Sequence, residues 1–403
     1  MSNYNYTGRN LSGETINGTI TATSSENALQ LIRKQNIYPI KINPESKRDL
    51  TINLSFVEKV KSKDLSFFCR QFYAMLDAGI PLVESLDLLK KQTSNKRLKS
   101  AIEFVFEEVQ KGSILSRSMK KQSDVFPDIL VYMVETGEIS GQLDMVMGRM
   151  ADHFEKETKL QSKVKNAMLY PIIVSLVALC VIFFLITYVL PSFVDMFTGF
   201  GAQLPLPTRI LLGVSSIFRN YWYLLLGTII FMIYTFKKYG KTEKGRYKID
   251  YLKLKIPIFG DVNSKVATSR FSRTLASLLV SGINIIEAME IVQKVIGNAV
   301  ISKGINQSMD SIRKGGGIAG PLSDLNVFPM VLISMIKVGE ESGSIDTMLS
   351  KTADFYDEEV DSAVEKMTTM LEPMIIVVLA LVVGMIILAV ITPMFDMYQY
   401  VGQ

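Results

Sequence analysis

Four carboxylates that recur at two places along the chain are its most suggestive polar residues. Glu138 and Asp144 lie in the stretch GEISGQLD, and Glu340 and Asp346 lie in GEESGSID. The simplest interpretation is structural, since carboxylates cap helix N-termini and are stabilised by the positive end of a helix. The alternatives are a docking edge for a basic partner or a Ca²⁺ site, because oxygen ligands suit a hard cation. Two carboxylates in each copy are too few to predict a metal site.

The recurrence belongs to an internal repeat that covers most of the chain. FCRQFYAMLDAGIPLVESL, from Phe68, resembles FSRTLASLLVSGINIIEAM, from Phe271. FPDILVYMVETGEISGQLDMVM, from Phe126, resembles FPMVLISMIKVGEESGSIDTML, from Phe328. Apolar residues recur at helical spacing within each copy, so each is expected to be an antiparallel helical bundle that continues into a membrane helix.

The GExSG segment of each copy predicts a boundary between two helices. We expect its first glycine to form a left-handed helix end and its serine to be the N-cap of the next helix. The acidic residue four positions after the serine would then lie near the positive end of that helix. The candidate residues for structural turns or partner docking are Gly137, Glu138, Ser140, Gly141 and Asp144 in the first copy, and Gly339, Glu340, Ser342, Gly343 and Asp346 in the second.

Two glycine motifs match phosphate-binding patterns in letters but not in context. The GKT at 240–242 lacks the first glycine of a P-loop, because residue 235 is Thr, and it follows an apolar helix rather than a strand. The GxGxxG at 315–320 follows a helical stretch and runs into a proline, whereas a dinucleotide fingerprint needs a strand before it and a helix after it. We expect a helix-to-helix loop at the second motif, and no cofactor at either.

The composition argues against most other chemistry. A single His among 403 residues excludes multi-histidine zinc sites, and two distant cysteines offer neither a disulfide framework nor a Cys-rich metal site. His153 aligns with Phe355 of the second copy, which predicts a packing or surface position. The 44 Lys and Arg against 39 Asp and Glu give a net charge of +5, too small to indicate nucleic acid. We therefore expect no catalytic residue, no metal and no enzyme activity.

Three apolar stretches are long enough to cross a bilayer. The second of them is interrupted by Arg219 and Asn220, and we interpret Arg219 as reaching the outer headgroups from a long or tilted helix. The acidic run near the third stretch, from Asp354 to Asp361, is interpreted as a solvated face. The predicted segments are an α/β module at 1–50, helical bundles at 62–168 and 264–372, and membrane helices at 169–191, 210–236 and 373–393.

The distribution of cations predicts the orientation. Lysines precede the first span and a Lys- and Arg-rich stretch follows the second, whereas the segments at 191–209 and 393–403 contain a single cation, Arg209. The positive-inside rule then places the N-terminus and both bundles in the cytoplasm and the C-terminus outside. Both copies run from the cytoplasm outward, so the repeats are parallel. The first 50 residues differ, with strand patterns at 16–22 and 36–42, a helix capped by Ser24 between them, and a linker at 43–49.

The chain resembles the inner-membrane platform proteins of type IV pilus assembly and type II secretion, the F family. The resemblance rests on the doubled FPxxLxxMxxxGExSGxLD-like block, the block before it, the order of the spans and the small leading module. The resemblance covers essentially the whole chain. It implies a mainly α, non-enzymatic membrane hub. Its implied partners are a cytoplasmic hexameric ATPase, pilins or pseudopilins, and other inner-membrane assembly proteins, with self-association into a dimer or tetramer.

Two other classes of function are weaker interpretations. An oligomeric permease would need polar residues inside the spans, which are almost free of ionisable side chains. A membrane sensor would need a ligand-sized outer domain, and the predicted outer loop at 191–209 is too short for one.

Overall fold

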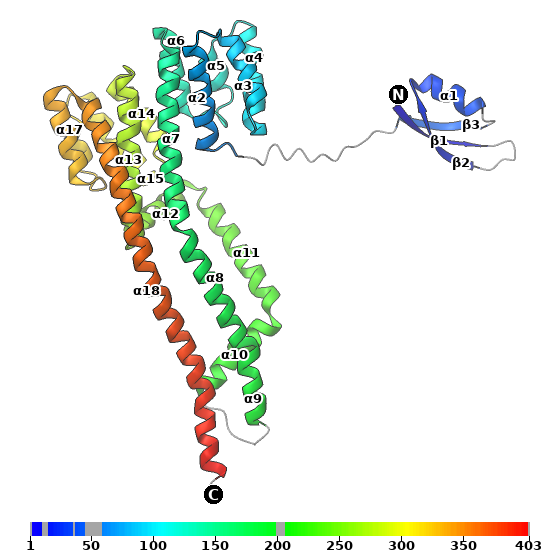
Figure 1. Cartoon of the computed structure of the whole chain (residues 1–403), viewed down its shortest axis with the longest axis vertical. Coiled ribbons are helices and arrows are strands. Elements are labelled where there is room, and N and C mark those ends of the chain that lie inside the picture. The colour runs from blue at the N-terminus through cyan, green and yellow to red at the C-terminus, as the bar shows by residue number, and fades with distance from the viewer. Residues whose placement is uncertain (1, 10–14, 35–36, 45–58, 199–205, 402–403) are drawn as a thin grey trace. The chain divides into compact units, whose positions relative to one another are not determined.

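The structure is a computed structural model that describes residues 2–9, 15–34, 37–44, 59–198 and 206–401. It divides into two compact units, Met1–Lys59 and Val60–Gln403. The predicted fold class is confirmed in outline, because the described chain is mainly helical with a small sheet near its N-terminus (Figure 1).

The described residues of the N-terminal unit form a three-stranded antiparallel sheet with one helix. Its core contains Tyr6, Ile32 and Ile37. The Ser24 hydroxyl accepts a hydrogen bond from the Asn27 backbone N–H at 3.2 Å, which confirms the predicted cap. The elements are β1 (Ser2–Arg9), β2 (Thr15–Ala22), α1 (Ser25–Lys34) and β3 (Tyr38–Pro44), and the strand order is β2-β1-β3.

Two differences from the sequence prediction concern this unit. The central strand β1 was not predicted, because SNYNYTGR is polar and lacks a clear apolar alternation. The predicted linker at 43–49 begins inside β3, where Asn43 pairs with Asn5 and Pro44 with Tyr4. Residues 45–49 lie outside the described residues.

The second unit contains two six-helix segments with the same helix order. The first consists of α2 (Ser62–Asp77), α3 (Leu82–Gln92), α4 (Lys96–Gln110), α5 (Leu115–Lys120), α6 (Asp128–Ser140) and α7 (Leu143–Ala167). The second consists of α13 (Phe259–Val280), α14 (Ile285–Val295), α15 (Ala299–Arg313), α16 (Ala319–Ser323), α17 (Met330–Ser342) and α18 (Ile345–Val401). The helix α12 (Glu243–Lys255) precedes the second segment.

The repeated sequence explains the repeated helix boundaries. Gly79 and Gly282 end their first helices with φ of 77° and 84°, which favours glycine because it has no Cβ. Asn95 and Asn298 then start the third helix of each copy. The Asn95 side-chain oxygen accepts from the Leu98 N–H at 3.0 Å, and Asn298 makes the equivalent bond.

The two bundles are not independent. A single cluster of buried apolar side chains includes Phe68, Phe72 and Phe126 of the first copy together with Phe271 and Leu275 of the second. Helix α6 packs against α14, and α7 packs against both α13 and α18. The sequence predicted a compact bundle for each copy but not the core that the two share, because periodicity identifies a buried face but not which copy covers it.

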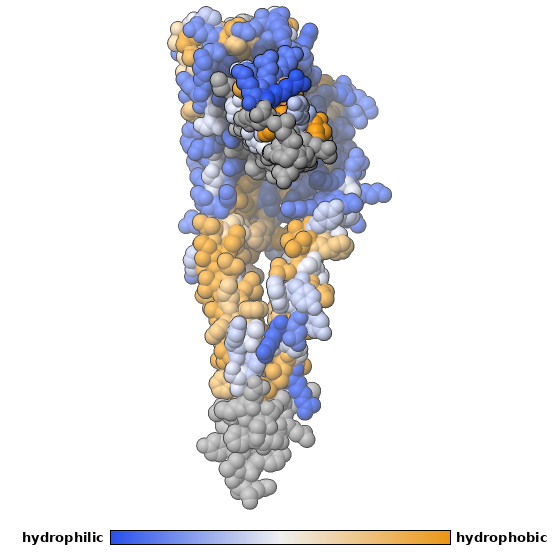
Figure 2. Space-filling view, turned by 90° about the vertical axis from the view of Figure 1, so that its right-hand side faces the viewer, coloured by the Kyte–Doolittle hydropathy of each residue, from blue (hydrophilic) through white to orange (hydrophobic). Residues whose placement is uncertain are grey.

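Two continuous helical segments of the described chain, Leu143–Val194 and Ile345–Thr392, are long and apolar enough to cross a membrane. The first joins α7 to α8 (Leu169–Phe184), a π-helical turn (Leu185–Val189) and α9 (Leu190–Thr198). Figure 2 shows the apolar side chains of this unit gathered over these helices, away from the polar bundles.

The second predicted span is not a single helix. It consists of α10 (Leu206–Asn220) and α11 (Trp222–Tyr239), which meet at 76° and together form a third candidate span. The single long or tilted helix expected here is therefore wrong, whereas the contact of Arg219 with the outer headgroups stays a prediction. Arg219 and Asn220 lie at the end of α10, where polar residues favour a helix end over an apolar continuation.

Candidate functional site

The glutamate of each GExSG turn caps a neighbouring short helix. The Glu138 carboxylate accepts hydrogen bonds from the backbone N–H groups of Leu115 at 2.7 Å and Ser116 at 2.9 Å, at the start of α5. In the second copy Glu340 accepts from the Ile318 and Ala319 N–H groups at the start of α16. This arrangement satisfies helix donors that would otherwise lack partners and places negative charge at the positive helix end.

The capping interpretation of the glutamates is therefore confirmed, although each glutamate caps a helix other than its own. Both side chains are occupied by their own bundle, which argues against their use as a docking edge. Asp144 and Asp346 lie in the first turns of α7 and α18, as predicted. None of the described residues form a group of three or more His, Cys, Asp or Glu side chains placed to hold a metal ion.

The prediction for the first glycine of each turn is wrong. The residue with left-handed backbone is the second glycine, Gly141 with φ 70° and Gly343 with φ 66°. Gly137 and Gly339 are buried inside α6 and α17. Glycine is needed at Gly339 for close approach, because a Cβ there would lie 2.8 Å from the Ile345 Cα.

The serines do not start the next helices either. Ser140 and Ser342 are the last residues of α6 and α17, and the Ser342 hydroxyl donates to the Val338 carbonyl oxygen at 2.7 Å. The left-handed helix end therefore comes four residues later than predicted in each copy, and Glu138 and Glu340 lie within the last turns of α6 and α17. The sequence pattern alone allowed either glycine to end the helix.

The two glycine motifs have structural explanations. Gly315 ends α15 with φ 82°, and a Cβ on Gly317 would lie 2.9 Å from the Glu340 carboxylate. Residues 315–318 of the motif thus lie in a loop between α15 and α16, as predicted, whereas Ala319 and Gly320 already belong to α16. In the GKT at 240–242, the Thr242 hydroxyl accepts from the Gly245 N–H at 3.2 Å and caps α12.

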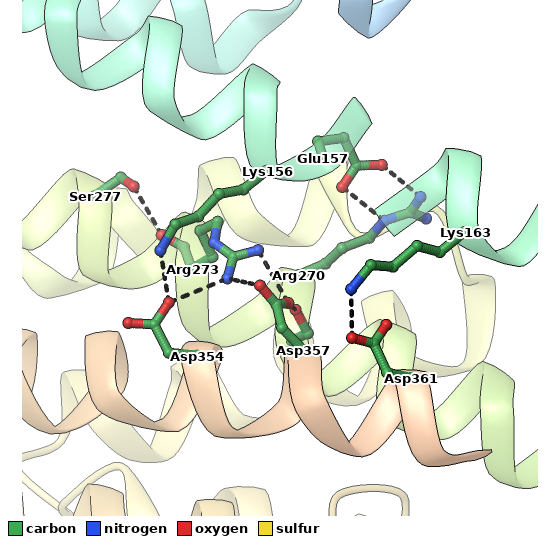
Figure 3. A network of polar contacts seen from close by, with 10 residues as sticks. Lys156, Glu157, Lys163, Arg270, Arg273, Ser277, Asp354, Asp357 and Asp361 are labelled. Atoms are coloured by element: carbon green, nitrogen blue, oxygen red, sulfur yellow. Dashed lines mark hydrogen bonds and ion pairs between the residues drawn. The ribbon is translucent and has the colours of Figure 1, made fainter. Parts of the chain in front are cut away.

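A second set of polar contacts joins the long helices of the two copies (Figure 3). Lys156 of α7 donates to Asp354 of α18 at 2.5 Å. Lys163 of α7 pairs with Asp361 of α18, about two helical turns further along both helices. Glu157 of α7 accepts from the Arg270 Nε of α13 at 3.1 Å. We call this set the stalk ion-pair cluster; its members are Lys156, Glu157, Lys163, Arg270, Arg273, Asp354, Asp357 and Asp361.

The cluster corrects the prediction for the acidic run. Asp354, Asp357 and Asp361 pair with cations of α7 and α13, and Glu359 pairs with Lys265 at 2.9 Å, so these carboxylates are not merely a solvated face. Sequence reasoning missed the contacts of Lys156, Glu157 and Lys163 because their partners lie in the other copy.

One arginine occupies the same position in both copies but has different surroundings. Arg70 pairs with Asp152 at 2.6 Å and its side chain is 44% exposed. Its counterpart Arg273 binds Asp357 and is 9% exposed, because α7 of the first copy covers it. The identity of Arg70 with Arg273 and of Asp152 with Asp354 was the sequence signal that could have revealed this contact.

His153 is buried where α7 meets the second copy. Burial, together with the charges of Arg273 and Arg270, lowers the pKa of His153 to about 4, so the imidazole is neutral at pH 7. Its Nδ1 makes no hydrogen bond with any described residue. The predicted packing position is confirmed.

An open groove of about 900 Å³ lies beside the GExSG turn of the first copy. Ile139 and Ile114 line it and are 82% and 51% exposed, next to the cationic side chains Arg117 and Lys120. In the second copy the residue equivalent to Ile139 is Glu341. The first copy therefore exposes apolar surface here that the second does not.

The family model described as type II secretion system (T2SS), protein F matches residues 68–191 and again residues 271–393. The chain belongs to this family. The model of the family's N-terminal domain matches residues 1–43. The two matched segments correspond to the two copies predicted from the sequence.

Relatives named as type IV pilus assembly proteins and as type II secretion system proteins align with nearly the whole chain. A type IV pilus assembly protein PilC of Myxococcus xanthus is 38% identical, over 96% of this chain and 93% of its own length. The protein of the same name from Thermus thermophilus is 37% identical over 98% of both chains. A type II secretion system protein F of Aeromonas hydrophila is 31% identical over 94% of this chain and 98% of its own length.

Proposed function

We propose that this protein is the inner-membrane platform of a type IV pilus or type II secretion machine. Its N-terminal unit and both bundles lie in the cytoplasm and its C-terminus outside. It binds a cytoplasmic hexameric ATPase and passes the motion of that motor to pilins or pseudopilins that leave the bilayer. The protein itself is not an enzyme, and it acts as a dimer or tetramer with other inner-membrane assembly proteins.

The observation that carries this proposal is the continuity of bundle and membrane segment in each copy. The helical segment Leu143–Val194 and the helix α18 each start in a bundle and end in an apolar stretch. The stalk ion-pair cluster ties α7 to α18 and α13 on the bundle side of these stretches. A tilt imposed on the bundles is therefore transmitted to both spans together.

The groove beside the first GExSG turn is well placed for the ATPase. It lies at the start of α7, and α7 has 25 residues before α8 begins. At 1.5 Å per residue the groove lies about 37 Å along the helix from the apolar segment, clear of the bilayer. Its lining combines the exposed Ile114 and Ile139 with the cations Arg117 and Lys120, and apolar side chains next to polar and charged ones are typical of protein interfaces.

Co-purification from membranes tests the proposal. The intact chain should bring with it a hexameric ATPase and a small pilin-like protein. Ile139→Glu, which installs the residue of the second copy at an exposed position, should lower the ATPase recovered by about tenfold, equivalent to about 1.4 kcal/mol. Met330→Glu is the matched control, since Met330 is 71% exposed and lies outside the groove.

Two outcomes would contradict the proposal. The platform role fails if no ATPase accompanies the intact chain from cells that assemble the machine. The groove assignment fails if Ile139→Glu and Met330→Glu retain the same amount of ATPase.

A further inference from the structure

A basic groove lies where the second candidate span meets the second bundle. It has a volume of about 940 Å³ and is formed by the start of α12, the end of α14 and the start of α15. Five exposed cations line it against one acidic residue, Glu243. The cations are Lys244, Arg246, Lys248, Lys294 and Lys303.

These cations are largely unneutralised. Among the described residues, the one ion pair that these five cations make is that of Arg246 with the buried Asp250, at 4.0 Å. Asp250 is also engaged in capping α15, where it accepts from the Ala299 N–H at 3.0 Å. Because Asp250 and Asn298 already satisfy the first N–H groups of α15, an anion in the groove would bind the cationic side chains.

The groove lies directly beside the end of an apolar helix. α11 ends at Tyr239, and α12 starts at Glu243 after a tight turn. A Cβ on Gly245 would lie 2.0 Å from the Tyr239 carbonyl oxygen, so the two helix ends are in close contact. Figure 1 shows α12 between the second bundle and the end of α11.

The exposed residues of α12 have the composition of a membrane interface. Tyr247 and Tyr251 are 39% and 43% exposed, and Leu252 is 57% exposed. They lie among lysines, and Lys255 is 4.8 Å from the Tyr251 ring centre. Exposed aromatic and aliphatic side chains among lysines are characteristic of helices at the level of lipid headgroups.

We propose that this groove binds the phosphate of an anionic phospholipid headgroup in the leaflet that faces the bundles. The inference rests on the proposed membrane placement of α11. Basic pockets at the cytoplasmic end of membrane helices are suited to acidic headgroups, and each Lys or Arg near the surface contributes about 1 kcal/mol to such attraction. The bound lipid would fix the second bundle against the membrane surface.

The test uses the full chain in nanodiscs of mixed phosphatidylcholine and phosphatidylglycerol, with retained lipid quantified after extraction into detergent. The variant Lys244→Gln/Lys248→Gln/Lys303→Gln should reduce retained phosphatidylglycerol by about tenfold. The control variant Lys237→Gln/Lys238→Gln/Lys241→Gln removes the same charge beside the same span but outside the groove. It should retain phosphatidylglycerol within about twofold of the unmodified chain.

Three results would overturn the inference. Equal losses in the two variants would show general attraction to the membrane surface, and no loss in the groove variant would show that the groove is not used. Displacement of the lipid by millimolar inorganic phosphate would assign the site to free phosphate instead. Each of these leaves ATPase co-purification unaffected, so a failure here is distinguishable from a failure of the platform role.

Discussion

Glu138 and Glu340 each hold the start of a helix too short to be stable alone. α5 has six residues and α16 has five, and helices of this length depend on tertiary contacts. Each carboxylate supplies two acceptor oxygens to backbone N–H groups. Glu138 therefore positions the short helix α5, whose first residues line the groove beside the first turn.

Replacing Glu138 should loosen α5. Glu138→Ala leaves the Leu115 and Ser116 N–H groups without their acceptors and should lower the free energy of unfolding by about 1–2 kcal/mol. Thermal unfolding in detergent and hydrogen exchange at α5 measure the effect. Glu135→Ala, at an exposed position of the same helix, should change neither. Equal stability of Glu138→Ala and the unmodified chain would show that the cap is unimportant.

The protonation of His153, at the contact between the two copies, should make the free energy of unfolding depend on pH. Its pKa of about 4 lies below the value of about 6.5 in an unfolded chain. The unfolded state therefore binds more protons between these values, so the free energy of unfolding should fall as the pH drops from 6.5 towards 4. The loss attributable to this residue is about 3 kcal/mol at most.

The single imidazole makes this prediction directly measurable. NMR titration of the full chain should show one histidine signal with a midpoint near 4, and His153→Phe should reduce the loss of stability at low pH. A midpoint near 6.5 would mean that His153 is not buried between the copies.

At the scale of elements, the two copies of the repeat allow the same ion pair to be compared in an exposed and in a buried setting. Arg70 and Arg273 occupy equivalent positions on α2 and α13, and both pair with carboxylates of the long helix that ends their bundle. Exposed ion pairs contribute about 0–1 kcal/mol, whereas removal of one partner from a buried pair costs about 3–5 kcal/mol. Only the second copy buries this contact.

Neutralising the carboxylate in each copy should therefore give unequal results. Asp357→Asn leaves the buried Arg273 without its main partner and should destabilise the protein by about 3 kcal/mol. Asp152→Asn at the exposed Arg70 should cost less than about 1 kcal/mol. Unfolding midpoints of the two variants test the difference, and equal midpoints would contradict the packing of α7 over Arg273.

The elements also show which parts of the fold were predictable. The Ser24 cap and the helices of each copy follow local rules of helix ends and apolar periodicity, so the sequence was sufficient. The end of α6 was misplaced because two glycines of the turn could take the left-handed backbone, and the ion pairs of α7 with the second copy were missed because their partners lie far away in the sequence. Contacts between distant segments are not determined by periodicity or propensity.

At the scale of the whole molecule, two copies of one unit share a single core and continue into separate apolar helices. The internal repeat, the three apolar stretches and the family were all accessible from the sequence, because each rests on residue identities or composition. The bend between α10 and α11 and the packing of α6 on α14 were not. Both depend on which surfaces meet in three dimensions.

The placement of both bundles on one side of the membrane is the claim on which the platform role depends. Single cysteines at Ser100, Ser311 and Ser192, all exposed, report on the two bundles and on the far end of the first span. Cys180→Ala removes the exposed native thiol, and the remaining Cys69 is buried, which raises its thiol pKa and keeps it unreactive.

A membrane-impermeant maleimide applied to inside-out and right-side-out vesicles makes the measurement. Ser100→Cys and Ser311→Cys should both react in inside-out vesicles, and Ser192→Cys should react in right-side-out vesicles. Reaction of Ser100→Cys and Ser311→Cys from opposite sides would contradict the parallel arrangement of the two copies and, with it, the proposed platform.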